Sequence, residues 1–177
     1  MTIKQGELFP IMKQPTDEYI VVSALASELP NALPQKILFT GVGKVNATHI
    51  LTRYLVDHPE VKKVINYGTC GGVHGVKKGE VVKVTTFIQG DMDCGPLTEG
   101  SGITFGDDVA ISDVLNFGTD GLICRTQDQF IDEIESLDML QHLLEGNKFN
   151  VVDMEAYALA KVCAYMNVDS ICYQYVS

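Results

Sequence analysis

Apolar runs and helical patterns alternate along this chain. The apolar runs contain many β-branched residues and predict buried strands at 19–25, 36–40, 61–67, 79–88, 121–125, 149–152 and 170–177. Residues 44–58 instead have apolar side chains at positions 47, 50, 51, 54 and 55, a spacing that predicts a helix. A second helix is expected to follow Asp153, whose side chain can cap it, and to end near Met166.

Strands that alternate with helices indicate an α/β fold whose sheet is covered on both faces. The sequence has no internal repeat and no low-complexity linker, so residues 1–177 are expected to form a single domain. Residues 1–17 are polar and contain proline, which favours an N-terminal arm. Residues 89–120 are rich in Gly, Asp and Thr and have weak periodicity, which indicates an irregular excursion that can supply binding residues.

The charge and the cysteines narrow the classes of function. A net charge of −10 and a pI near 4.7 argue against nucleic-acid partners and against anionic membrane surfaces, because both require a basic face. No apolar run approaches the roughly 20 residues that span a bilayer, and residues 1–19 lack the apolar core of a signal peptide. The five cysteines are odd in number and show no CxxC spacing, which predicts reduced, mostly buried thiols in a cytoplasmic protein.

Two glycine-rich stretches follow predicted strands. Residues 40–47 (TGVGKVNA) resemble a dinucleotide fingerprint at first, but Asn46 stands where the third glycine belongs, and the stretch lacks the ending of a P-loop. A tight strand-to-helix turn is the plainer interpretation. In residues 67–72 (YGTCGG) the glycines would let a ligand approach the backbone closely. A turn that binds no ligand is the equal alternative there.

Acidic residues mark three further positions. Glu28 follows a buried strand, where a lone carboxylate is usually a solvated surface group. Residues 91–94 (DMDC) have no neighbouring histidine, so neither a metal nor any other cofactor is expected. Glu155 comes directly after a strand, at the edge of an α/β sheet where ligands bind, and a carboxylate there can accept two hydrogen bonds from a vicinal diol. The alternative is a solvated glutamate in the first turn of a helix.

Taken together, these segments resemble the nucleoside phosphorylase/nucleosidase family, and within it the 5′-methylthioadenosine/S-adenosylhomocysteine nucleosidases. The resemblance implies a three-layer α/β/α fold with a central mixed sheet of the nucleoside phosphorylase type. It also implies a role in nucleoside metabolism and methionine salvage. Five stretches match in the family's order: the first strand 20–28, the turn 41–47, the N-x-G-[ST]-x-G-G motif at 66–72, the D-x-F-I-like stretch 128–131 and the strand-to-helix segment 151–160.

The resemblance assigns roles to particular residues. Glu28 would position the attacking water, Glu155 would bind the ribose hydroxyls, and Met154 would pack against the ribose. Phe130 would stack on the purine, while backbone groups of Phe130 and Ile131 would contact the adenine edge. The other expected substrate-binding residues are Leu25, Thr69, Cys70, Gly71 and Asp153.

The chain departs from the family pattern at its end. In the family the last strand continues into an aspartate that protonates the leaving base, whereas this sequence stops at Ser177. We therefore expect a chain without that general acid and without the closing C-terminal helix, either as a fragment or as a degenerate member. The expected consequence is weak turnover, with nucleoside binding retained.

Hydrolysis is favoured over phosphorolysis, because arginine side chains usually build phosphate sites and this chain has only Arg53 and Arg125. The expected activity is therefore hydrolysis of the N-glycosidic bond of purine nucleosides. A purine nucleoside phosphorylase and a non-catalytic nucleoside-binding protein are the alternatives. The resemblance also implies a homodimer or a larger homo-oligomer.

Overall fold

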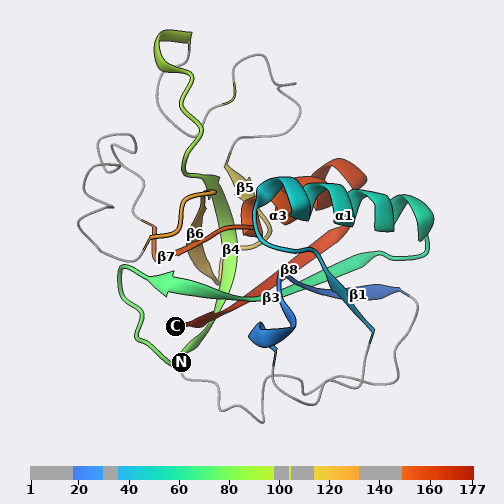
Figure 1. Cartoon of the computed structure of the whole chain (residues 1–177), viewed down its shortest axis with the longest axis horizontal. Helices are drawn as coiled ribbons and strands as arrows, with labels where there is room; N and C mark the ends of the chain where they lie inside the picture. Colours follow the sequence, from blue (N-terminus) through green and yellow to red (C-terminus); the bar gives the residue numbers. More distant parts are fainter. Residues whose placement is uncertain (1–17, 30–35, 98–103, 105–113, 132–148) are drawn as a thin grey trace.

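The computed structural model describes residues 18–29, 36–97, 104, 114–131 and 149–177, and its architecture is shown in Figure 1. One sheet has eight strands. The strands are β1 (Tyr19–Ser23), β2 (Ile37–Phe39), β3 (Lys63–Gly72), β4 (Val81–Gln89), β5 (Leu115–Asn116), β6 (Leu122–Thr126), β7 (Val151–Asp153) and β8 (Asp169–Val176). The helices are α1 (Lys44–Asp57) and α3 (Ala156–Met166), with short 3-10 turns η1 (Ala26–Glu28) and η2 (Gly95–Leu97).

The sheet is mixed, as the family resemblance implied. Its order is β2-β1-β3-β7-β6-β4-β5, and β8 pairs in addition with β3 and β4. Strand β3 runs parallel to β1 and β8 but antiparallel to β7, while β4 runs parallel to β6 and antiparallel to β8. Strands β3, β7, β6, β4 and β8 therefore pair in a closed ring. Closing the sheet in this way removes free edges from these central strands.

Both described helices pack side by side on one face of the sheet (Figure 1). Apolar side chains of α1 and α3 meet those of β1 and β3 in one buried cluster, and α3 also packs on β4, β6 and β8 in a second. This arrangement confirms the α/β class and the two helices expected from their spacing. The described ranges contain no helix on the opposite face, so the second helical layer stays a prediction. The expected N-terminal arm (1–17) lies outside the described residues.

Strand β3 is longer than the sequence indicated. The glycine-rich stretch was expected to end the strand at Tyr67, but β3 continues through it to Gly72. The reason is crowding by neighbouring strands. A Cβ atom added at Gly68 would lie 3.0 Å from the Gln174 side chain, and one at Gly72 would lie 2.8 Å from Val176. The glycines therefore allow close packing within the ring of strands rather than a turn.

A buried arginine makes Gly90 sensitive to substitution. Arg125 is 0% exposed, and its guanidinium donates a hydrogen bond to the Gly90 carbonyl. A Cβ atom at Gly90 would lie 2.0 Å from Arg125 Nε. We expect Gly90→Ala to lower the free energy of unfolding by about 2–3 kcal/mol, measured by chemical denaturation. In an Arg125→Ala background the same change should cost much less, because the clashing side chain is gone. Equal costs in the two backgrounds would contradict this explanation.

Candidate functional site

A cavity of about 510 Å³ opens where the chain leaves β1, β6 and β7, beside the glycine-rich end of β3. This is the edge of the sheet at which the sequence placed a binding site. The cavity brings together every residue predicted for the site: Leu25, Glu28, Thr69, Cys70, Gly71, Phe130, Ile131, Asp153, Met154 and Glu155. It is also lined by Ala24, Val42, Gln127, Gln129, Val152 and Ser177.

Glu28 is held in the cavity wall by four hydrogen bonds. Its Oε1 accepts bonds from the backbone N–H of Thr69 (3.1 Å) and the Thr69 hydroxyl (2.8 Å). Its Oε2 accepts bonds from the Leu25 N–H (2.9 Å) and the Ser23 hydroxyl (3.1 Å). The Ser23 hydroxyl has a single proton and also lies 3.2 Å from the Leu25 carbonyl oxygen, so it can donate either to that oxygen or to Glu28. A bound water can therefore reach Glu28 when the Ser23 or Thr69 hydroxyl turns away, since these two donors are free to rotate.

Glu155 faces the same cavity from the N-terminus of α3. Its Oε1 accepts a hydrogen bond of 2.7 Å from the N–H of Gly43, which lies 112 residues earlier in the chain. Burial raises the pKa of Glu155 to about 7; the Gly43 N–H opposes this, and the nearby Asp153 and Glu28 carboxylates add to it. Glu155 is therefore a partly buried acid that changes charge near neutral pH.

The turn that reaches Glu155 depends on its glycines. Gly41 has φ of 76° and Gly43 has φ of 94°, a region that residues with a side chain rarely adopt. Gly43 is also the N-cap residue of α1, so its N–H is not used within the helix. The interpretation of 40–47 as a tight strand-to-helix turn is confirmed, and the turn supplies a hydrogen-bond donor to the site.

Asp153 is a buried acceptor behind the cavity. Its Oδ1 accepts bonds from the Thr126 hydroxyl (2.6 Å) and the Cys124 thiol (3.3 Å), and its Oδ2 accepts one from Gln174 Nε2 (3.0 Å). Burial raises the pKa of the Asp153 carboxyl, although the Thr126 bond opposes the shift. The neighbouring Cys70 thiol lines the cavity, and burial raises its pKa to about 12, so it is a poor nucleophile.

The predicted cap of the second helix is confirmed with a small correction. Asp153 Oδ2 accepts a bond of 2.9 Å from the N–H of Ala156, the first residue of α3. Glu155 was considered as a first-turn residue, but it is the N-cap residue and lies outside the helix. That position turns its side chain toward the Gly43 turn, across the cavity edge.

Phe130 and Ile131 lie in the segment that follows β6. Phe130 lines the cavity and is 75% exposed, so its ring is accessible to a ligand in the cavity. Gln127 and Gln129, which the sequence analysis did not assign, line the cavity beside it. Gln127 is fully buried and its amide donates to the Gln129 carbonyl (3.2 Å). Their place between a strand end and Phe130 is the sequence signal that could have identified them.

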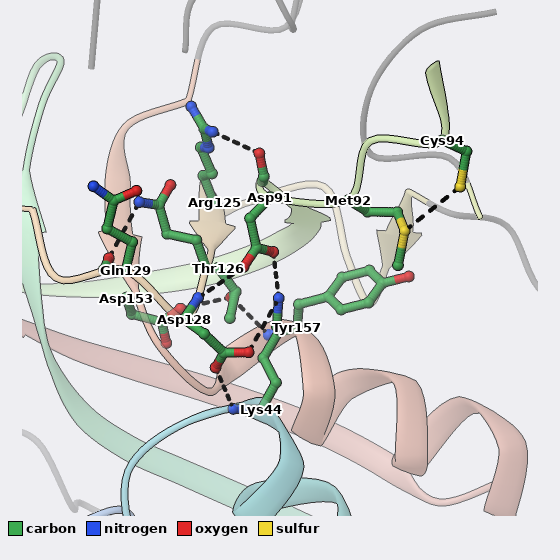
Figure 2. Close-up of polar contacts among 12 residues, drawn as sticks. Lys44, Asp91, Met92, Cys94, Arg125, Thr126, Asp128, Gln129, Asp153 and Tyr157 are labelled. Atoms are coloured by element: carbon green, nitrogen blue, oxygen red, sulfur yellow. Dashed lines mark hydrogen bonds and ion pairs between the residues drawn. The ribbon is translucent and has the colours of Figure 1, made fainter. Parts of the chain in front are cut away.

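Lys44, Asp91 and Asp128 form a polar cluster that the sequence did not predict, shown in Figure 2. The Lys44 ammonium pairs with Asp91, and lies 3.5 Å from Asp128 Oδ2. Asp128 Oδ1 accepts the Lys44 backbone N–H (2.8 Å), and the Asp128 N–H donates to Asp91 Oδ2 (2.9 Å). Burial raises the pKa of Asp91, but the Lys44 ammonium and the Asp128 N–H outweigh it and hold the pKa below its usual value.

Neither arginine lines the cavity. Arg125 is buried against the carbonyl of Gly90 and the ring of Phe149, and Arg53 lines a separate groove on the outer side of α1. Among the described residues around the cavity, none is a lysine or an arginine. The described part of this site therefore has no cationic side chain for a phosphate.

Comparisons with known proteins agree with this fold. The family model described as the phosphorylase superfamily matches residues 27–177. The chain belongs to the phosphorylase superfamily. No curated protein sequence matches it significantly. The described part of the chain has no helix with the length and apolar character that crossing a membrane requires.

Solved structures of a futalosine hydrolase and of nucleosidases share the fold at low sequence identity. The native futalosine hydrolase of Helicobacter pylori strain 26695 has a TM-score of 0.74 at 16% identity, covering 90% of this chain and 86% of that one. A 5′-methylthioadenosine/S-adenosylhomocysteine nucleosidase from Colwellia psychrerythraea 34H, in complex with adenine, has a TM-score of 0.72 at 18% identity, covering 90% and 81%. A Helicobacter pylori nucleosidase mutant with 5′-methylthioadenosine in its active site has a TM-score of 0.73 at 17% identity, covering 92% and 86%.

Proposed function

We propose that this chain is a purine nucleosidase that hydrolyses the N-glycosidic bond of 5′-methylthioadenosine/S-adenosylhomocysteine-type nucleosides. One observation supports this most strongly. The carboxylates of Glu28 and Glu155, from separate elements, line one cavity together with the exposed ring of Phe130. Two acids and an aromatic ring around one cavity suit a sugar with a flat base attached.

Glu155 holds the sugar in this proposal. Its carboxylate accepts hydrogen bonds from the ribose 2′- and 3′-hydroxyls, while the Gly43 N–H fixes one of its oxygens. Phe130 packs against the base, and the Met154 side chain packs against the ribose. As the base departs, the sugar gains positive charge. The ionised Glu155 and Glu28 interact more strongly with this positively charged transition state than with the neutral substrate. This difference lowers the barrier to cleavage.

Glu28 is the general base. When the Thr69 or Ser23 hydroxyl turns away, one oxygen of Glu28 becomes free to accept a hydrogen bond from a water molecule. Glu28 then takes a proton from the water as it attacks the anomeric carbon, while the base leaves with the electron pair of the N-glycosidic bond and is protonated by solvent water. The backbone N–H groups of Thr69 and Leu25 keep the carboxylate in place during this exchange.

Water is the proposed nucleophile rather than phosphate. Phosphate would need cationic or multiple N–H donors, and the described lining residues supply no lysine or arginine. The test is chromatography of 5′-methylthioadenosine and adenosine after incubation with the protein, with and without phosphate. Adenine release in phosphate-free buffer is the expected result. Release only with phosphate, together with ribose 1-phosphate, would establish the phosphorylase instead. Nucleoside binding without release would identify a non-catalytic binding protein.

We also propose a cytoplasmic homodimer or larger homo-oligomer. Both described helices expose large apolar side chains, which supports a protein contact there: Val45 and Val56 of α1, and Tyr165 and Met166 of α3. Light scattering coupled to size-exclusion chromatography should give a mass of at least twice the 19.4 kDa of one chain. A mass of one chain at micromolar concentration would contradict this part of the proposal.

A further inference from the structure

Asp128 connects two parts of the site that are far apart in the sequence. It follows β6 and stands two residues before Phe130, on the side of the cavity proposed for the base. Its carboxylate accepts the backbone N–H of Lys44, the first residue of α1, at 2.8 Å. That N–H is one of the donors that a helix cannot satisfy internally. Asp128 thus caps α1 from a segment 84 residues away.

The residue directly before Lys44 is Gly43, whose N–H donates to Glu155 at 2.7 Å. Successive backbone N–H groups of one turn therefore bind two carboxylates on opposite sides: Gly43 binds Glu155, and Lys44 binds Asp128. Gly43 has φ of 94°. Because glycine adopts many backbone conformations with similar ease, its own preference does not fix the direction in which its N–H points. The turn is also held by the Asn46 amide, which donates to the Val42 carbonyl at 2.7 Å, and by the Gly41 N–H, which donates to the Ala24 carbonyl at 3.1 Å. The bonds at Lys44 are those that tie it to the segment after β6.

The Lys44 side chain strengthens this hold. Its ammonium lies between Asp91 and Asp128, and the side chain is only 13% exposed (Figure 2). Asp91 follows β4, so the cluster joins the ends of β4 and β6 to the start of α1. The Asp91 and Asp128 side chains are more exposed, at 32% and 46%, but several charges joined in one hydrogen-bonded network are worth more than an isolated surface pair.

We infer that Asp128 is a positioning residue: it fixes the Gly43 turn so that Glu155 is aimed at the sugar, and so links the base side of the cavity to the sugar side. Asp128 itself touches neither sugar nor base in this inference. This inference rests on the proposed function for the identity of the ligand. Asp128 would maintain the bond between Gly43 and Glu155 whichever ligand binds.

The first test compares adenine with 5′-methylthioadenosine by calorimetric titration of proteins that all carry Glu28→Gln, because this change slows cleavage of the nucleoside and keeps its affinity. The dissociation constant of adenine divided by that of 5′-methylthioadenosine measures what the sugar side adds to affinity. Asp128→Ala removes the acceptor for the Lys44 N–H, so the ratio should fall at least about tenfold, as one charge-assisted hydrogen bond is lost. Adenine binding should change less than about threefold. Asp128→Asn keeps an oxygen that accepts the Lys44 N–H, and it should restore most of the ratio.

A matched control is available on the surface. Lys83 and Asp120 form an ion pair of 2.8 Å away from the cavity lining. Asp120→Asn should leave both dissociation constants unchanged. Equal losses of adenine and nucleoside affinity in Asp128→Ala would overturn the inference, because they would indicate a general structural role. An unchanged ratio would overturn it as well. Failure of the wild-type protein to bind either compound would instead refute the proposed function, and the second test then decides.

The second test needs no ligand. The pKa of Glu155 is measured by carbon-detected NMR in wild-type, Asp128→Ala and Asp128→Asn proteins. Asp153 and Glu28 face Glu155 and raise its pKa, while the Gly43 N–H lowers it. Losing the Asp128 charge alone would lower the pKa of Glu155 slightly. Losing the Gly43 bond would raise it, so a rise in Asp128→Ala, reversed in Asp128→Asn, is the expected result. A fall or no change in Asp128→Ala overturns the inference.

Discussion

Replacing Glu28 with Gln is expected to slow adenine release by about 10²–10⁴-fold, the usual contribution of a general base. Glutamine cannot take a proton from water at neutral pH. Its amide also has only one acceptor oxygen, whereas backbone N–H groups of Thr69 and Leu25 approach both positions. One of them will face an NH₂ group, so stability should fall by about 1–3 kcal/mol. Single-turnover release of adenine and chemical denaturation measure the two effects.

The control for Glu28 is Ser23→Ala. This change removes one hydroxyl donor to Oε2 but leaves the carboxylate and both backbone donors in place. Turnover should therefore stay within about tenfold of wild type, since a single hydrogen bond is worth about 1 kcal/mol. Nucleoside affinity should persist in both variants. If Glu28→Gln released adenine at the wild-type rate, Glu28 would not be the base.

Replacing Glu155 with Gln should weaken nucleoside binding by roughly 10–150-fold, because hydrogen bonds to a charged partner contribute about 1.5–3 kcal/mol. Free adenine lacks the ribose diol, and its affinity should change little. The amide oxygen can still accept the Gly43 N–H, so the turn should stay in place. Titration of adenine, adenosine and 2′-deoxyadenosine measures the effect. A wild-type preference for adenosine over 2′-deoxyadenosine that survives in Glu155→Gln would contradict the assigned role.

The same substitution should change how stability depends on pH. The pKa of Glu155 is raised from 4.5 to about 7 by burial and by its acidic neighbours. Between these values the folded state binds more protons than the unfolded state, so stability falls as pH rises from about 4.5 to 7. Because the side chain is partly exposed, the total loss of folding stability over this pH range is on the order of 2 kcal/mol. Glu155→Gln should therefore be more stable than wild type at pH 8 and no more stable at pH 4. Parallel stability curves would contradict the raised pKa.

Local patterns predicted most of the secondary structure. The strands at 19–25 and 36–40 and the helix at 44–58 agree closely with β1, β2 and α1, because a continuous apolar run and a helical spacing of apolar side chains are both visible in a short window. The prediction that β3 ends before its glycine-rich stretch was wrong for a physical reason. Glycine usually marks a turn, but at Gly68 and Gly72 it makes room for side chains of β8, a strand about a hundred residues later.

The members of the site were predicted, but their interactions were not. Spacing and resemblance identified Glu28 and Glu155, and both line the cavity. The donor to Glu155, however, is a backbone N–H 112 residues away, and no local pattern predicts it. Asp91 is a similar case. The sequence argued against a metal at residues 91–94 but did not reveal a partner for Asp91, which the fold pairs with Lys44 across 47 residues.

The sequence by itself determined the class of fold, the order of the strands and helices along the chain, and the identities of the acids and the aromatic ring. The fold class and the order of elements follow from side-chain periodicity, which is a local property, whereas the acids and the aromatic ring were identified by the resemblance of their motifs to the family. Only the tertiary structure decided the closed ring of β3, β7, β6, β4 and β8, the raised pKa of Glu155, and the cluster that holds its partner turn. Burial, electrostatics and long-range hydrogen bonds depend on which distant segments meet, and that is set by packing of the whole domain.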